Sequence, residues 1–173
     1  MWDPGGETSN TVCIAPLRTV RIGSITNNGH KVESRSELDN HADTCVVGPD
    51  TALLIHDFDR PVRVHGYKED VGTVNNCRTV SVVLVYDHPE SGKVYMLVLY
   101  RAILIEQMTA NLLSPMQLRD NDLRVNDEPK FMVPKPTEGH HAVIIQETDE
   151  KEGITIPLSL NGVTSYFPTR KPT

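Results

Sequence analysis

Alternating apolar and polar positions cover most of the chain, and this period of two predicts β-strands. Stretches with a strand-like pattern, bounded by turn-forming residues, are 18–25, 31–38, 51–56, 62–67, 77–86, 93–105, 123–126, 141–146, 154–160 and 163–167. Two Asn-Gly pairs, Asn28-Gly29 and Asn161-Gly162, predict tight hairpin turns. The run from Asp57 to Pro61 predicts a turn between two of the strands.

One late stretch has the signals of a helix. Ser114 is suited to be an N-cap and Pro115 to be the first helical residue, so we expect about two turns that end near Asn121. The pattern therefore predicts an all-β fold with one short helix. Its expected parts are a flexible lead over 1–17, a domain over 18–127, and a proline-rich linker with a C-terminal β-hairpin over 128–173.

Composition narrows the class of protein. The chain has 173 residues and a formal net charge of −6, and a nucleic-acid-binding module would need a basic face. Its apolar runs are shorter than the roughly 18 residues of a membrane span, and its start lacks the pattern of a signal peptide. Three cysteines without paired spacing are typical of reduced thiols. We therefore expect a cytoplasmic protein that is not secreted and binds neither nucleic acid nor membrane.

One short stretch concentrates the candidate chemistry. Leu38 leads into Asp39, which is followed by small and polar residues, and the chain becomes apolar again at Val46-Val47 before Gly48-Pro49. Asp and Asn favour turns, whereas a Val pair favours a half-buried strand. An acid at such a loop tip is either a catalytic group or a turn-former.

The chain resembles the retropepsins, the aspartic proteases of retroviruses and retrotransposons, from about Arg18 to Asn126. Leu38-Asp39-Asn40-His41-Ala42-Asp43 stands where that family has Leu-Asp-Thr/Ser-Gly-Ala, often followed by another Asp. Asn111-Leu112-Leu113-Ser114 stands at the family's second apolar turn and helix start, and is also similar to the end of the protease region in copia-type polyproteins.

The resemblance implies a closed β-barrel with a flap hairpin over 62–79. It also implies a two-fold homodimer in which each subunit gives one catalytic Asp39, with no cofactor or metal, acting on an extended peptide of a polyprotein. The implied site residues are those of the active-site loop, the flap and the second turn: Asn40, His41, Ala42 and Asp43; Val64, His65, Gly66, Tyr67 and Gly72; and Asn111, Leu112 and Leu113.

Other interpretations of the same residues stay open. Asn40 stands where the family has a hydroxyl and His41 where it has Gly, so an inactive dimer that serves as a binding or assembly module is an alternative. Asp39, His41, Asp43 and Cys45 occupy every second position, which on a strand would line one face as metal ligands. Cys45 with His41 would also be a conceivable nucleophile and base.

Overall fold

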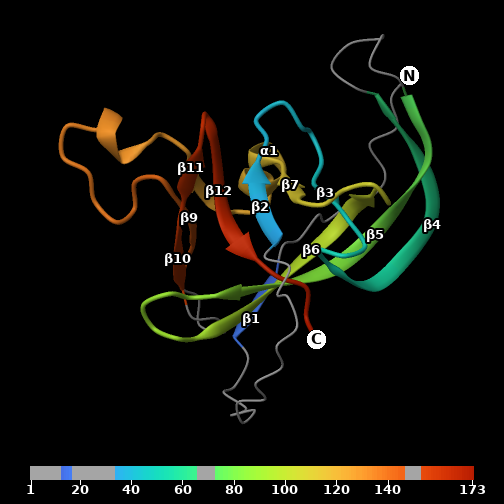
Figure 1. Cartoon of the computed structure of the whole chain (residues 1–173), viewed down its shortest axis with the longest axis horizontal. Helices are drawn as coiled ribbons and strands as arrows, with labels where there is room; N and C mark the ends of the chain where they lie inside the picture. The colour runs from blue at the N-terminus through green and yellow to red at the C-terminus, as the bar shows by residue number, and fades with distance from the viewer. Residues whose placement is uncertain (1–12, 17–33, 66–72, 147–152) are drawn as a thin grey trace.

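The computed structural model describes residues 13–16, 34–65, 73–146 and 153–173, and its described part is mostly β-structure with one short α-helix (Figure 1). This confirms the predicted all-β class. The elements in chain order are β1 (Cys13–Pro16), β2 (Ser34–Leu38), β3 (Val46–Val47), β4 (Leu53–His65), β5 (Thr73–Asp87), β6 (Val94–Leu104), β7 (Asn111–Leu113), α1 (Pro115–Asp120), β8 (Arg124–Asn126), the 3-10 helix η2 (Lys130–Met132), β9 (Ala142–Ile145), β10 (Ile154–Pro157), β11 (Ser159–Asn161) and β12 (Thr164–Thr169).

Nine strands form the main sheet, in the order β11-β12-β2-β7-β3-β6-β5-β4, with β1 on the edge of β6. The closed barrel expected from the resemblance does not form among the described strands, because this order has two ends, β11 and β4. β4 occupies the outer edge of β5 up to Val83, and beyond it a single bridge joins Val85 to Arg170. The C-terminal segment therefore touches β5 at one point without completing a ladder.

The long β4-β5 hairpin corrects a predicted turn. Asp57 to Pro61 was expected to separate two strands, but β4 continues through it as an irregular stretch with shifted register. Asp59 has a φ of 51°, and its N–H donates to Oδ1 of Asp57 at 3.0 Å. Arg78 on β5 pairs with the same Asp57 carboxylate at 2.6 Å. These contacts absorb the turn-forming residues as a bulge, so the chain does not reverse there.

The first and last described strands both join the main sheet. Cys13–Pro16, expected to be part of a flexible lead, instead form β1, since the edge of β6 at Tyr95–Val98 lies beyond β3 and accepts a partner. The Asn161-Gly162 turn joins β11 to β12 as predicted, with Gly162 at a φ of 63°. β12 then pairs with β2, whose other edge is taken by β7. The predicted strand over 18–25 and the Asn28-Gly29 turn lie outside the described residues.

A single apolar core lies between the main sheet and a second, three-stranded sheet of order β10-β9-β8. Val80–Tyr86 on β5 is buried throughout, and Tyr86 meets Phe167 of β12 edge to face at 5.9 Å between ring centroids. Burial of each such side chain stabilises the fold by about 1.5–3 kcal/mol. The second sheet turns Val143 and Ile156 toward this core.

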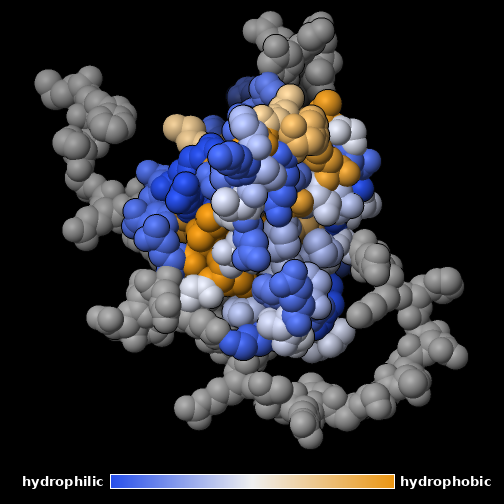
Figure 2. Space-filling view, turned by 90° about the vertical axis from the view of Figure 1, so that its left-hand side faces the viewer, coloured by the Kyte–Doolittle hydropathy of each residue, from blue (hydrophilic) through white to orange (hydrophobic). Residues whose placement is uncertain are grey.

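The side of the molecule that carries the second sheet is largely hydrophilic, with apolar areas between the polar ones (Figure 2). η2 projects at the outer end of this side, and its Phe131 and Met132 are exposed (Figure 1). In the described part of the chain no helix has the length and apolar character of a membrane span.

A buried histidine connects the second sheet to the main one. His141 precedes β9 with a φ of 52°, and its Nε2 lies 3.0 Å from Oγ of Ser165 on β12. Its carbonyl oxygen accepts the N–H of Leu158 at 2.8 Å. Burial lowers the pKa of His141 below its usual value, and the charge of Lys130 acts in the same direction. The folded state therefore favours the neutral imidazole.

A lowered pKa makes stability depend on pH in a defined direction. His141 contributes stability that is fully present above the usual histidine pKa of about 6.5 and is lost as the pH falls through the lower folded pKa. We expect His141→Asn, which tolerates positive φ, to lose less stability than the wild type between about pH 7.5 and pH 5.5. Urea unfolding at both pH values measures this. His140→Asn is the matched control, and an equal loss in all three proteins would contradict the prediction.

Gly48 follows β3 at a place where no side chain fits. A Cβ at this position would overlap the backbone carbonyl of Met108. We expect Gly48→Ala to destabilise the fold by about 2–3 kcal/mol, because the obstacle is backbone and cannot rotate away. Gly139→Ala is the control, since its Cβ would make only ordinary contact with Ile144 at 3.4 Å. Thermal unfolding measures the stability of both variants. An equal loss in the two would refute the steric explanation.

Candidate functional site

The candidate site is built on Asp39–Thr44, called here the acid loop, which connects β2 to β3. β2 and β7 run parallel with Leu38 opposite Leu113, and the N–H of Asp39 donates to the carbonyl of Leu113 at 3.0 Å. Both leucines are buried. Asp39 therefore leaves the sheet where two parallel strands end side by side.

The carboxylate of Asp39 shapes its own loop. Its Oδ1 accepts the N–H of His41 at 2.9 Å, the pattern of an Asx turn, while its carbonyl accepts the N–H of Ala42 at 3.2 Å. Nδ1 of His41 lies 3.7 Å from the same Oδ1. The Asp39 side chain keeps 35% of its surface exposed. One carboxylate oxygen thus forms the turn, and the carboxyl group as a whole is accessible to solvent.

The start of α1 anchors the acid loop. The Ser114 hydroxyl accepts the N–H of Gln117 at 3.1 Å, which confirms the predicted N-cap, and donates to the carbonyl of Ala42 at 2.7 Å. Oε1 of Gln117 accepts the N–H of Cys45 at 2.7 Å, and its Nε2 donates to the carbonyl of Tyr100 at 3.2 Å. Ser114 and Gln117 are both buried. The helix thus fixes the loop through one residue that the sequence indicated and one that it did not.

A row of buried, hydrogen-bonded polar side chains links β2 and β7 to neighbouring parts of the fold. Thr51 donates to Oδ1 of Asn111 at 2.6 Å, and Nδ2 of Asn111 donates to the hydroxyl of Ser36 at 3.4 Å. Ser36 in turn lies 2.9 Å from the hydroxyl of Thr169. These residues come from β2, β7, β12 and the turn before β4. Asn111 was expected at the second turn, but its bonding to the other three was not predicted.

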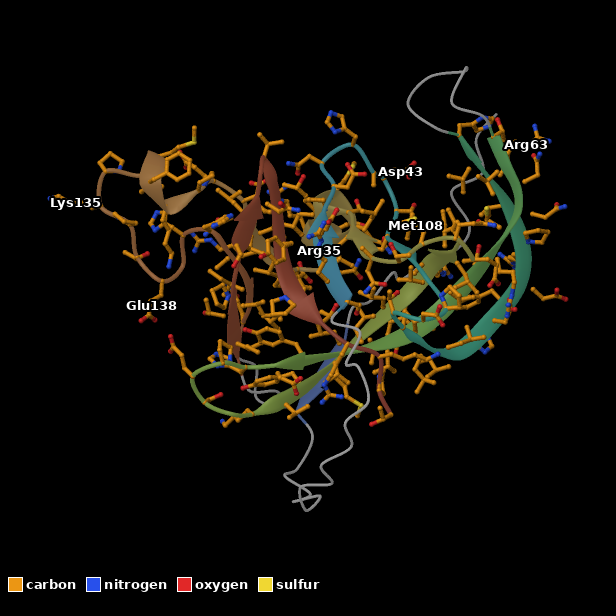
Figure 3. The ribbon with its side chains drawn as sticks, in the orientation of Figure 1. Arg35, Asp43, Arg63, Met108, Lys135 and Glu138 are labelled. Atoms are coloured by element: carbon orange, nitrogen blue, oxygen red, sulfur yellow. The ribbon has the colours of Figure 1, made fainter. Side chains whose placement is uncertain are left out.

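A cleft of about 470 Å³ opens between the acid loop and the β4-β5 hairpin. Its lining residues are Asp43, Thr44, Val62, Arg63, Val64, His65, Thr79, Arg101 and Ile103. Asp43 on the loop and Arg63 on β4 belong to its two sides (Figure 3). Of the expected flap residues, Val64 and His65 line the cleft, while Gly66, Tyr67 and Gly72 lie outside the described residues. Asp39, Asn40, His41 and Ala42 are not part of this lining.

The second turn and the acid loop meet in the structure. Leu113 contacts the loop through its carbonyl, and Leu112 is half-buried opposite Glu37 in the β2-β7 pair. At the end of the β4-β5 hairpin where the two strands connect, Nδ1 of His65 lies 3.3 Å from the hydroxyl of Thr73. The expected residues therefore fall into two groups: Asp39 and Ala42 against β7 and α1, and Asp43 with Val64 and His65 around the cleft.

The metal-ligand interpretation does not fit the loop geometry. The turn at Asp39 breaks the strand on which alternate residues would share a face, so Cys45 is fully buried whereas the His41 side chain is 82% exposed. In the parts of the chain that the structure describes, no three His, Cys, Asp or Glu side chains are placed to hold a metal ion together.

The thiol interpretation does not fit either. The Sγ of Cys45 accepts the N–H of Ser114 at 3.3 Å, and burial raises the pKa of the thiol to about 11. At neutral pH the thiol is protonated and cannot act as a nucleophile. Cys45 and Cys77 are both buried, unpaired cysteines.

Comparisons with protein-family models, with curated proteins and with solved structures found no match to this chain, so its site stands on its own geometry.

Proposed function

We propose that the chain is one protomer of a homodimeric aspartic endopeptidase of the retropepsin type, which cleaves a retrotransposon-type polyprotein. The main support is the position of Asp39, which follows β2 at its parallel junction with β7 and has an accessible carboxyl group. A cleft between the same loop and a long hairpin offers room for a peptide.

Aspartic proteolysis needs two carboxylates that share one proton. One takes a proton from the attacking water, and the other donates its proton to the carbonyl oxygen of the scissile bond. Two close carboxylates cannot both be ionised, so they titrate as a pair. This chain has one loop of the required type, and Asp39 of a second copy related by a two-fold axis would supply the partner.

The cleft residues fit an extended peptide chain. Val62 and Val64 are half-buried on the β4 side, where they offer apolar contact to alternate side chains of a bound strand. Asp43 on the loop side presents a carboxylate acceptor for a peptide N–H. Cys45 and Cys77 are unpaired, which is compatible with action in a reducing, intracellular compartment.

A binding or assembly module without catalysis is the second candidate, and the loop chemistry favours it. Oδ1 of Asp39 already accepts the N–H of His41, and the imidazole lies close to the same oxygen. This oxygen is thus engaged within its own loop, which leaves it less available to share a proton with a second carboxyl group. Asn40 brings an amide to the position where the family has a hydroxyl.

The peptidase proposal makes Asp39→Asn the decisive variant. Asn keeps an oxygen that can accept the His41 N–H, so the loop should remain folded, but it cannot exchange a proton with water. We expect cleavage of the parent polyprotein to fall by at least about 10²–10⁴-fold. Asp50→Asn, an exposed neighbour outside the acid loop, is the matched control. Undiminished cleavage by the Asp39 variant would remove this residue from the mechanism.

A shared active site also predicts interference between subunits. At concentrations where dimers form, mixing the wild type with an equal amount of Asp39→Asn should lower the cleavage rate to about half, because random pairing halves the number of intact dimers. Titration of the variant into a fixed amount of wild type measures this. A rate that does not change would show that one chain acts alone. Peptide-library cleavage that is absent, or insensitive to an aspartic-protease inhibitor, would favour the second candidate.

A further inference from the structure

Arg101 occupies an irregular position in the middle of β6. The register between β5 and β6 shifts between Val80, opposite Ala102, and Val82, opposite Leu99. Within this bulge Arg101 has a φ of 57°, a conformation that residues other than glycine seldom adopt. Bulges redirect side chains away from the regular alternation of a strand. Here the redirected side chain belongs to the lining of the cleft.

Among the described residues the charge of Arg101 has no acidic partner. In the described part of the chain only Arg101 and Arg170 are half-buried arginines. Arg170 forms a bidentate pair with Asp87, at 2.6 and 2.9 Å. Arg101 has no carboxylate within 4.0 Å among the described residues, and its guanidinium carbon lies 5.9 Å from the ring centre of Phe58. A partly desolvated cation of this kind gains from an added carboxylate.

The surroundings of Arg101 complete a site for one side chain. Thr79 and Ile103 line the same cleft from β5 and β6, and Ile103 is half-buried and apolar. Arg63 adds a second cation from β4, so the described lining residues include two arginines and the single carboxylate of Asp43. Methylene groups of a glutamate would contact Ile103, and its carboxylate would reach the planar guanidinium, which binds carboxylates through two parallel hydrogen bonds.

We propose that Arg101 makes this cleft select a peptide with an acidic side chain, glutamate or aspartate, at one position. This inference rests on the proposed function in one respect, since it takes the cleft to be where a peptide binds. Arg101 is then a specificity-determining residue that takes no part in the chemical step.

Binding of a positional peptide library to the full chain tests this proposal without requiring cleavage. The chain carries Asp39→Asn, and the probes are fluorescein-labelled nonapeptides with Glu, Gln or Lys fixed at each position in turn. We expect one position at which Glu binds at least about tenfold tighter than Gln, and Lys binds more weakly than both. Arg101→Gln should reduce the Glu-to-Gln ratio to about one, and Arg101→Glu should reverse the preference toward Lys.

Two further variants separate recognition from folding. Arg101→Asn also removes the charge and tolerates a positive φ, so it should lose the preference even if the Gln variant unfolds. Arg124→Glu is the control for Arg101→Glu, because it makes the same charge change at an exposed residue of β8 outside the cleft lining. It should keep the preference for Glu. Absence of binding, absence of a Glu preference, or its survival in Arg101→Asn overturns the proposal.

Cleavage of the same peptides by the wild type distinguishes the two proposals. Selective binding without cleavage by the wild type would refute the peptidase and leave Arg101 as a selector of acidic peptides. Cleavage without a Glu preference would support the peptidase and refute the role of Arg101.

Discussion

The parallel pairing of β2 with β7 is the contact on which the arrangement of the site depends. It joins Ser36–Leu38 to Asn111–Leu113, two stretches far apart in the sequence, and it ends in the bond from the Asp39 N–H to the Leu113 carbonyl. Because both leucines are buried, a shift of either strand by one residue would expose one of them and move the acid. The position of Asp39 is therefore determined by core packing.

Buried polar groups make this pairing specific. Ser36, Asn111, Thr51 and Thr169 are almost fully buried, and each has a hydrogen-bond partner within the group. Burying such a group without a partner costs roughly 1–3 kcal/mol, so a misaligned β7 would leave several groups unsatisfied at once. The same holds for the buried Gln117, whose side chain accepts the N–H of Cys45 and donates to the carbonyl of Tyr100. The need to pair these buried polar groups thus fixes the register of β2 and β7 more tightly than hydrophobic burial alone would.

Local chemistry explains which features the sequence could predict. The Ser114-Pro115 start of α1 and the Asn161-Gly162 turn formed as expected, because each depends on residues within one or two turns of chain. Asp57 to Pro61 has equally strong turn residues, yet β4 continues, since pairing with β5 and the Arg78 contact favour an extended path. Partners distant in sequence, such as β12 for β2, were not predictable because alternation identifies a strand without identifying its neighbour.

The residues of the candidate site also divide into those that local sequence indicated and those that it did not. Asp39 and Asp43 stood out through turn chemistry and through the resemblance, whereas Gln117 and Arg101 gave no local signal. Gln117 looks like an ordinary helix residue, and its role comes from the position of Cys45 across the loop. Arg101 looks like a charged residue on an alternating strand, and a bulge opposite Ser81 gives it its place in the cleft.

The two sides of the cleft differ in how firmly they are held. The acid loop is bonded to β7 and to the buried start of α1, so it has little freedom to move independently. On the other side, Leu53–His65 contains no fully buried residue, and its described neighbours at Thr73–Asn76 are exposed as well. Segments with few buried contacts open at lower free energy than the core, and such segments serve as covers over binding sites. A fixed acid loop opposite a weakly packed hairpin would suit the proposed binding of an extended peptide, because the hairpin could move while the acid loop stays in place.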